Sequence, residues 1–188
     1  MSSFAKCTYV LAMLALNVSA AESGDTPTDH AKLYVGGISK DAAIVVHAFD
    51  ITNADLGKFK HQDTAKRSAQ TAPHLLAVDI VETLRGHGFS NITLSESSEP
   101  EGEALQLVGN FTEINPGSKA TRAWIGFGAG ASKVCVSGTL EADGEVVGEF
   151  KDCEKGLGWG DSSAQTSGES SRIGANIGEL LLAWTASP

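Results

Sequence analysis

The sequence predicts a small α+β protein with a single domain, in which a mixed or antiparallel sheet of about five strands packs against two helices. Three observations carry this prediction. An apolar, β-branched run occupies Ala43–Phe49. Leu105–Ile114 alternates in part between apolar and polar side chains, as do the two halves of a hairpin over Lys133–Cys153, and two other stretches show helical periodicity. No internal repeat and no linker divides the chain, so we expect one domain over residues 31–188.

The first twenty positions, residues 1–20, have the composition of a secretory signal peptide. Lys6 precedes the short apolar run Tyr9–Leu16, and small residues at 18–20 stand at the expected cleavage spacing. The run is too short to span a bilayer of roughly 30 Å, and a buried N-terminal helix is the alternative interpretation. We therefore expect an exported protein, periplasmic or extracellular, with a flexible polar tail over residues 21–30.

The net negative charge of the chain argues against one class of partner, nucleic acids. The chain of 188 residues carries a formal net charge of −9, and without Lys6 it has 13 basic against 23 acidic residues. Such a surface repels a phosphate backbone, so we do not expect nucleic acid as a partner.

The first half predicts a strand, a helix and a second strand. Ala43–Phe49 is nearly continuous in its apolar character, which is typical of a central strand covered on both sides. Asp50–Gln70 reads as a long loop or a partly helical excursion. A helix is expected over Ala72–Gly86, with Pro73 in its first turn, before a short strand at Phe89–Leu94 and an acidic loop at Ser95–Glu103.

The second half predicts a strand over Leu105–Ile114, then a hairpin and a helix. Lys133–Glu141 and Glu145–Cys153 read as strands around a three-residue loop at 142–144. Gly156–Gly168, rich in Gly and Ser with a lone Trp159, reads as a flexible loop. The last helix is expected over Glu169–Thr185 with Ser167 as its cap, and Gly174 and Gly178 permit close approach of a neighbouring element on one face.

Two cysteines, Cys135 and Cys153, fall in the predicted hairpin. The predicted register places Val146 and Phe150 together on one face. It places both thiols on the other face, which carries Ser137 and Lys151, about one diagonal step apart. A bulge or small slip would bring them to bonding distance, and an exported compartment permits disulfides. We expect a disulfide; two unpaired thiols are the alternative, and a metal site is not expected, since no histidine lies nearby in sequence.

The segment from Asn115 to Val136 combines a turn, an arginine and alternate glycines ahead of a strand. Backbone without a Cβ can approach another surface closely. Its hypothetical binding residues are Arg122, Trp124, Gly126, Phe127, Gly128 and Gly130. If the segment is exposed, its apolar side chains suit a partner protein, self-association or peripheral membrane contact. If it is folded under, it is only core packing.

The sequence gives little support for a nucleotide, cofactor, metal or nucleophile site, either in this segment or elsewhere. A β-patterned stretch, not a helix, follows the glycines, so we expect no nucleotide and no other cofactor. Arg122 suits an ion pair with Glu113 or Glu141, or an anionic ligand. The five histidines have no metal-binding spacing, and no motif for a nucleophile elbow or a zinc helix is present.

One family resemblance rests on specific residues. G-N-F-T-E-I at Gly109–Ile114, the Pro116-Gly117 turn, Arg122 and the run Ile125–Val134 resemble the DUF4410 family. The resemblance implies a protein of the bacterial envelope, exported or lipid-anchored, without an assigned activity. Cys7 precedes the apolar run instead of following it, which departs from the lipid-anchored pattern.

Together these features predict a non-catalytic accessory or binding protein of the bacterial envelope, periplasmic or extracellular, with no catalytic residues and no metal. One alternative is an envelope hydrolase with a dispersed site that includes His47, Asp50 and Arg122. Another is a structural protein that oligomerises through the glycine segment or through the helix face with Gly174 and Gly178.

Overall fold

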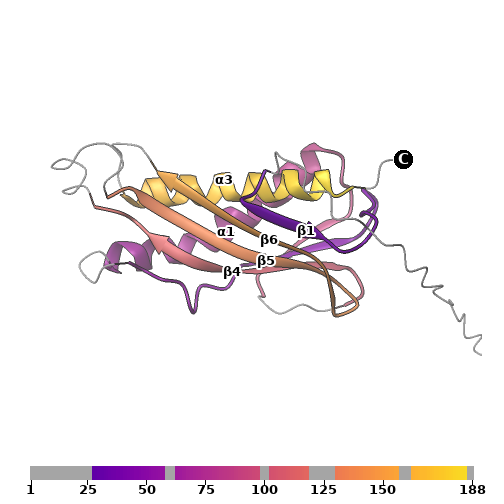
Figure 1. The fold of residues 1–188 in the computed structure, drawn as a ribbon, viewed down its shortest axis with the longest axis horizontal. Coiled ribbons are helices and arrows are strands. Elements are labelled where there is room, and N and C mark those ends of the chain that lie inside the picture. The colour runs from indigo at the N-terminus through magenta and orange to yellow at the C-terminus, as the bar shows by residue number, and fades with distance from the viewer. Residues whose placement is uncertain (1–26, 58–61, 98–101, 119–129, 157–161, 186–188) are drawn as a thin grey trace, which may run out of the picture.

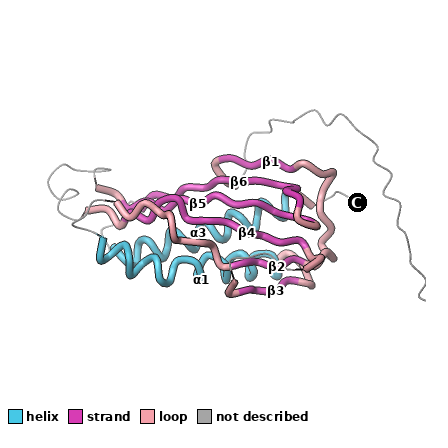
Figure 2. Tube along the Cα trace, turned by 90° about the horizontal axis from the view of Figure 1, so that it is seen from below, coloured by secondary structure: helices cyan, strands magenta, loops and turns pink. Residues whose placement is uncertain are grey.

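The computed structural model describes residues 27–57, 62–97, 102–118, 130–156 and 162–185. One sheet forms a layer, and two helices cover one of its faces (Figures 1 and 2). The predicted α+β class is confirmed, whereas the predicted signal peptide lies outside the described residues. The elements in chain order are β1 (His30–Leu33), β2 (Ile44–His47), α1 (Gln62–Gly86), β3 (Ile92–Ser95), β4 (Leu105–Asn115), β5 (Ser132–Ala142), β6 (Glu145–Gly156) and α3 (Ser162–Ala183).

The sheet has six strands in the order β1-β6-β5-β4-β2-β3. Strands β4, β5 and β6 form an antiparallel meander, while β2 runs parallel to both β3 and β4 and connects to β3 through α1. The sixth strand, β1, begins at His30 within the segment that the sequence predicts as a tail, and pairs antiparallel with β6. Its four residues alternate in burial, but a run of four is too short to identify a strand from sequence, and its partner is remote in the chain.

Helix α1 begins at Gln62, well before the predicted start at Ala72, so Pro73 lies inside the helix rather than in its first turn. Of the two interpretations of Asp50–Gln70, a long loop is wrong from Gln62 onward, and a partly helical segment is the one that the structure confirms. The added turns bury small side chains, Ala65, Ser68 and Ala69. Such side chains contribute little to hydropathy, so the apolar periodicity becomes visible only farther along the helix.

Helix α3 likewise begins before its predicted start, at Ser162, so the expected loop at Gly156–Gly168 is wrong over its last part and Ser167 is not a cap. Trp159 lies outside the described residues. The early turns of α3 bury Thr166, and its hydroxyl donates to the Ser68 hydroxyl of α1 at 2.7 Å. Polar side chains that pack inward hide a helix from a hydropathy pattern.

The element that approaches Gly174 and Gly178 is α1. A Cβ at Gly174 would lie 2.6 Å from the Leu76 carbonyl oxygen, and a Cβ at Gly178 would lie 2.6 Å from the Cβ of Thr83. The predicted close approach is confirmed, and it occurs within the chain. Oligomerisation through this helix face is therefore wrong, because α1 already occupies it.

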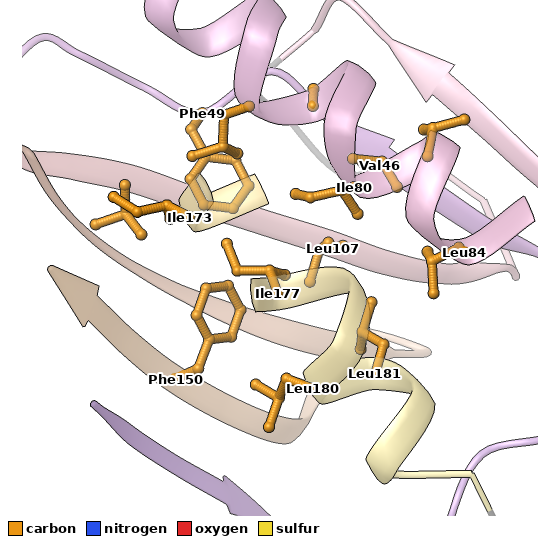
Figure 3. Close-up of a cluster of buried hydrophobic side chains, with 14 of the residues drawn as sticks. Val46, Phe49, Ile80, Leu84, Leu107, Phe150, Ile173, Ile177, Leu180 and Leu181 are labelled. Carbon is orange, nitrogen blue, oxygen red and sulfur yellow. The ribbon is translucent and has the colours of Figure 1, made fainter. Parts of the chain in front are cut away.

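The core lies between the sheet and the two helices. Figure 3 shows side chains from β2, β4, β6, α1 and α3 converging there, including Val46, Leu107, Phe150, Ile80 and Ile177. The Phe49 ring packs at 6.4 Å from Phe111 and at 6.3 Å from Phe150, measured between ring centroids. Neither helix, over its described residues, is long and apolar enough to cross a membrane.

Candidate functional site

The two ends of the connection between β4 and β5 are joined by a backbone hydrogen bond. The Ser118 amide donates to the Gly130 carbonyl at 2.9 Å, so the two ends of the connection lie side by side. Gly117 has a positive φ of 69°, and a Cβ there would overlap the Gly130 oxygen and the Ala131 carbonyl. Asn115 Oδ1 accepts a hydrogen bond from the Gly117 amide at 3.0 Å, which confirms the predicted turn. We call residues 115–118 and 130–132 the loop neck.

Of the predicted binding residues, Gly130 lies in the loop neck, with a φ of 75°. Arg122, Trp124, Gly126, Phe127 and Gly128 lie outside the described residues. The two acidic residues expected to pair with Arg122 have other partners: Glu113 binds Lys133 at 2.7 Å, and Glu141 accepts from the Thr139 hydroxyl at 2.9 Å.

A disulfide between Cys135 and Cys153 joins β5 to β6 close to the loop neck. The predicted bond is confirmed, but the predicted diagonal offset and three-residue loop are wrong, because the two cysteines pair directly in register. The hairpin turn contains only Asp143 and Gly144, both with positive φ. A bulge then makes Val147 the extra residue on β6 and supplies the shift that aligns the thiols.

The same bulge corrects the predicted face of Val146. The sequence pattern puts Val146 beside Phe150 on the core face, whereas the structure exposes 46% of Val146 and buries Phe150. One extra residue in a strand turns every side chain before it to the opposite face.

The inner side of the loop neck rests on buried polar groups that sequence reasoning missed. Ser132, the first residue of β5, donates its hydroxyl to the carboxylate of Glu169 on α3, and both residues are fully buried. Gly156 of β6 fits against this pair, since a Cβ there would overlap both side chains. This contact fixes the loop neck to α3. No hydropathy signal marks a buried Ser–Glu pair; a glutamate at the start of a helix reads as a solvated end.

The outer face of the sheet, away from α1 and α3, carries a polar surface that runs from the loop neck along β5. Alternate residues Lys133, Cys135, Ser137 and Thr139 lie on this face, because their neighbours Val134, Val136 and Leu140 are buried beneath it. Ser137 donates to Asn110 Oδ1 at 3.0 Å. The surface ends in a shallow hollow of about 440 Å³, lined by His30, Val108, Gly109, Asn110, Ser137, Gly138, Thr139, Glu149, Phe150 and Lys151.

The side chains named for a hydrolase have other roles where they are described. His47 is only 2% exposed, and its ring nitrogens lie 2.8 Å from the Ser97 carbonyl and 2.7 Å from Gln106 Oε1. The Asp50 carboxylate accepts from the Thr52 hydroxyl and the Thr52 amide, and these hydrogen bonds lower the pKa of Asp50. Arg122 lies outside the described residues. A buried His47 with both nitrogens occupied offers no access to a substrate.

Within the described ranges, no group of three or more His, Cys, Asp and Glu side chains could hold a metal ion. The described part of the site consists of the loop neck, held by the disulfide and the buried Ser132–Glu169 contact, and the polar outer face of the sheet beside it. It can position a surface for contact, and its hydroxyl, amide and charged groups can form hydrogen bonds.

Comparison with solved structures finds similar chains at low sequence identity, and the first of them supports a shared fold. PelC from Paraburkholderia phytofirmans, solved as a dodecamer, has a TM-score of 0.50 and 13% identity, over 79% of this chain and 94% of its own. A point variant of that protein gives 0.47 at 14% identity over the same shares. Protein XCC0632 from Xanthomonas campestris, of family DUF330, gives 0.43 at 10% identity, over 78% of this chain and 84% of its own.

No curated protein matches this chain significantly. A family model, described as a domain of unknown function, matches residues 41–160, which include β2 to β6, the loop neck and the disulfide. The match covers more than half of the chain, and the chain therefore belongs to the DUF4410 family.

Proposed function

We propose that this protein is an exported, non-catalytic accessory or binding protein of the bacterial envelope. It acts by contact, through the segment between the two ends of the loop neck and the outer sheet face beside it. The supporting observation is the bracing of the loop neck, because binding segments work best when a rigid scaffold positions them. Covalent, ionic and buried polar contacts converge there, through Cys135–Cys153, Lys133–Glu113 and Ser132–Glu169.

Export rests on two independent features. Residues 1–20 have the pattern of a signal peptide, and Cys135 and Cys153 pair as disulfides do in oxidising compartments. Fractionation of bacteria that express the full chain, compared with a chain lacking residues 1–20, tests export. The full chain is expected in the periplasm or the medium with its disulfide formed. Retention of the full chain in the cytoplasm would reject export.

The binding segment carries Trp124, Ile125 and Phe127 among alternate glycines, which combines apolar contact area with closely approachable backbone. Its partner is a protein surface, either an envelope protein or a second copy of this chain. Self-association is favoured by one observation: PelC, which shares the fold, forms a dodecamer.

Gly128→Leu tests the segment, with Gly86→Leu as the matched control, because a Cβ at Gly86 would meet nothing within 4 Å. Sedimentation velocity of the purified protein and pull-down from envelope extract are the readouts. Gly128→Leu is expected to weaken association in at least one of them, while Gly86→Leu leaves both unchanged. Equal behaviour of the two variants, with the fold intact, would exclude the segment as the binding surface.

A further inference from the structure

The His47 side chain is buried between two hydrogen-bond acceptors, and this arrangement bears on its protonation state. The ring lies on the outer side of β2 and contacts two oxygen atoms, one on each ring nitrogen. The Ser97 oxygen is a backbone carbonyl and can only accept a hydrogen bond. The second oxygen belongs to the side-chain amide of Gln106 on β4.

The orientation of the Gln106 amide is fixed by a third group. Its nitrogen donates to the backbone carbonyl of Ala104 at 3.0 Å. Turning the amide over would place Gln106 Oε1 against the Ala104 oxygen, two acceptors facing each other. Gln106 Oε1 therefore faces His47 as an acceptor, and the pair is almost fully buried, with 2% of His47 and 4% of Gln106 exposed.

A neutral imidazole carries one N–H and one lone pair, so it can donate to only one of these oxygens. The doubly protonated ring donates to both. We propose that His47 is a buried, pH-dependent anchor that, in its doubly protonated form, ties Ser97, just beyond β3, to β2 and β4. Loss of one proton turns one of the two hydrogen bonds into a contact between a lone pair and an acceptor, which favours release of Ser97 or Gln106.

Several titratable groups stand on the elements packed around this anchor. Gln106 pairs in register with Glu141 on β5. The connection itself begins with Glu96, which lies 3.7 Å from His74 of α1, and ends beside the exposed Glu103. Asp50 lies three residues beyond the end of β2, in an isolated bridge with Asn110 of β4. His74 is the one cationic candidate among these groups, and Glu96 lies against it. In this proposal the anchor holds Ser97, next to the acidic Glu96, through a positive charge, and it loosens as pH rises.

Nuclear magnetic resonance of the folded, isotope-labelled protein tests this proposal. Long-range spectra of the imidazole report the protonation of each ring nitrogen, and amide hydrogen exchange reports the anchoring of Ser95–Ser97 and Gln106. We expect both His47 nitrogens to be protonated at mildly acidic pH. As His47 loses a proton, exchange at Ser97 should accelerate by roughly tenfold beyond intrinsic base catalysis.

Two variants of one neighbour separate this role from simple packing. Gln106→Glu keeps the shape and the acceptor and adds negative charge, so His47 should keep its second proton to higher pH. Gln106→Met removes the acceptor, so the second proton should be lost at lower pH. A neutral His47 ring throughout, or deprotonation that leaves exchange at Ser97 unchanged, would overturn the proposal.

Discussion

Cys135 and Cys153 face each other directly across β5 and β6, with Cα atoms 4.1 Å apart, although the sequence pattern places them a diagonal step apart. A two-residue turn and one bulge residue supply the difference. The bond lies on the outer sheet face, between the loop neck and the hollow. The disulfide therefore lies within the proposed binding surface and also holds two strands of the sheet together.

Removing this bond is expected to destabilise the protein. The cysteines are 18 residues apart, and closing a loop of that size stabilises a fold by about 3 kcal/mol through the unfolded chain. Urea unfolding of a Cys135→Ser, Cys153→Ser double variant measures this loss. A reducing agent should weaken the native protein and leave the double variant unchanged; equal midpoints for the native and variant proteins under oxidising conditions would contradict the prediction.

We expect the free energy of unfolding to depend on pH through the buried carboxyl group of Asp152. It is almost fully buried between β6 and α3, and burial raises its pKa, against the opposing hydrogen bonds from the Asn176 side chain and the Asp29 amide. The folded state therefore binds this proton more tightly than the unfolded chain, whose ordinary value is 3.8. The destabilising effect of the ionised group is absent below that value and grows as pH rises through the raised pKa.

Asp152→Asn removes this titration, so the stability of the variant relative to the native protein should increase as pH rises from about 3.8 toward neutral. Urea unfolding over a pH series is the measurement. The exposed turn residue Asp143 offers a matched control, Asp143→Asn. A difference between native protein and Asp152→Asn that does not change with pH would show that Asp152 is not the group responsible.

The helix–helix contact predicts a strong effect of one methyl group. Gly174→Ala places a Cβ against the Leu76 carbonyl, which no side-chain rotation can relieve, and should cost about 1–3 kcal/mol by forcing α1 and α3 apart. Gly86→Ala, in open space at the end of α1, should change stability by less than about 1 kcal/mol. Thermal and urea unfolding compare the two, and similar effects from both would argue against the tight crossing.

Ser132→Ala tests the support beneath the loop neck. It removes the hydroxyl that donates to the buried Glu169 carboxylate, so we expect a loss of about 1–3 kcal/mol. Hydrogen exchange at the Ser118 amide should also accelerate if this contact holds the loop neck in place. Ser137→Ala, on the outer face, is the control; if it weakens the Ser118 amide as much, the effect is not specific to the buried pair.

Much of the fold can be predicted where apolar side chains alternate or recur. Strands β4, β5 and β6 and the later turns of both helices follow from the spacing of buried residues such as Leu107, Val136, Ile80 and Ile177. The disulfide partners can also be predicted, since both thiols fall on one face of one hairpin. The early turns of the helices cannot, because Ala65, Ser68 and Thr166 bury small or polar groups with little hydropathy signal.

The sequence by itself determined the fold class, the pairing of Cys135 with Cys153 and the need for an element close to Gly174 and Gly178. Only the tertiary structure decided that this element is α1, that β1 joins the sheet, and that His47 lies between two acceptors. The reason is that the periodic burial of a helix or strand depends on residues that are neighbours in the sequence. Register, bulges and hydrogen-bond partners are contacts between residues far apart in sequence, and packing alone selects them.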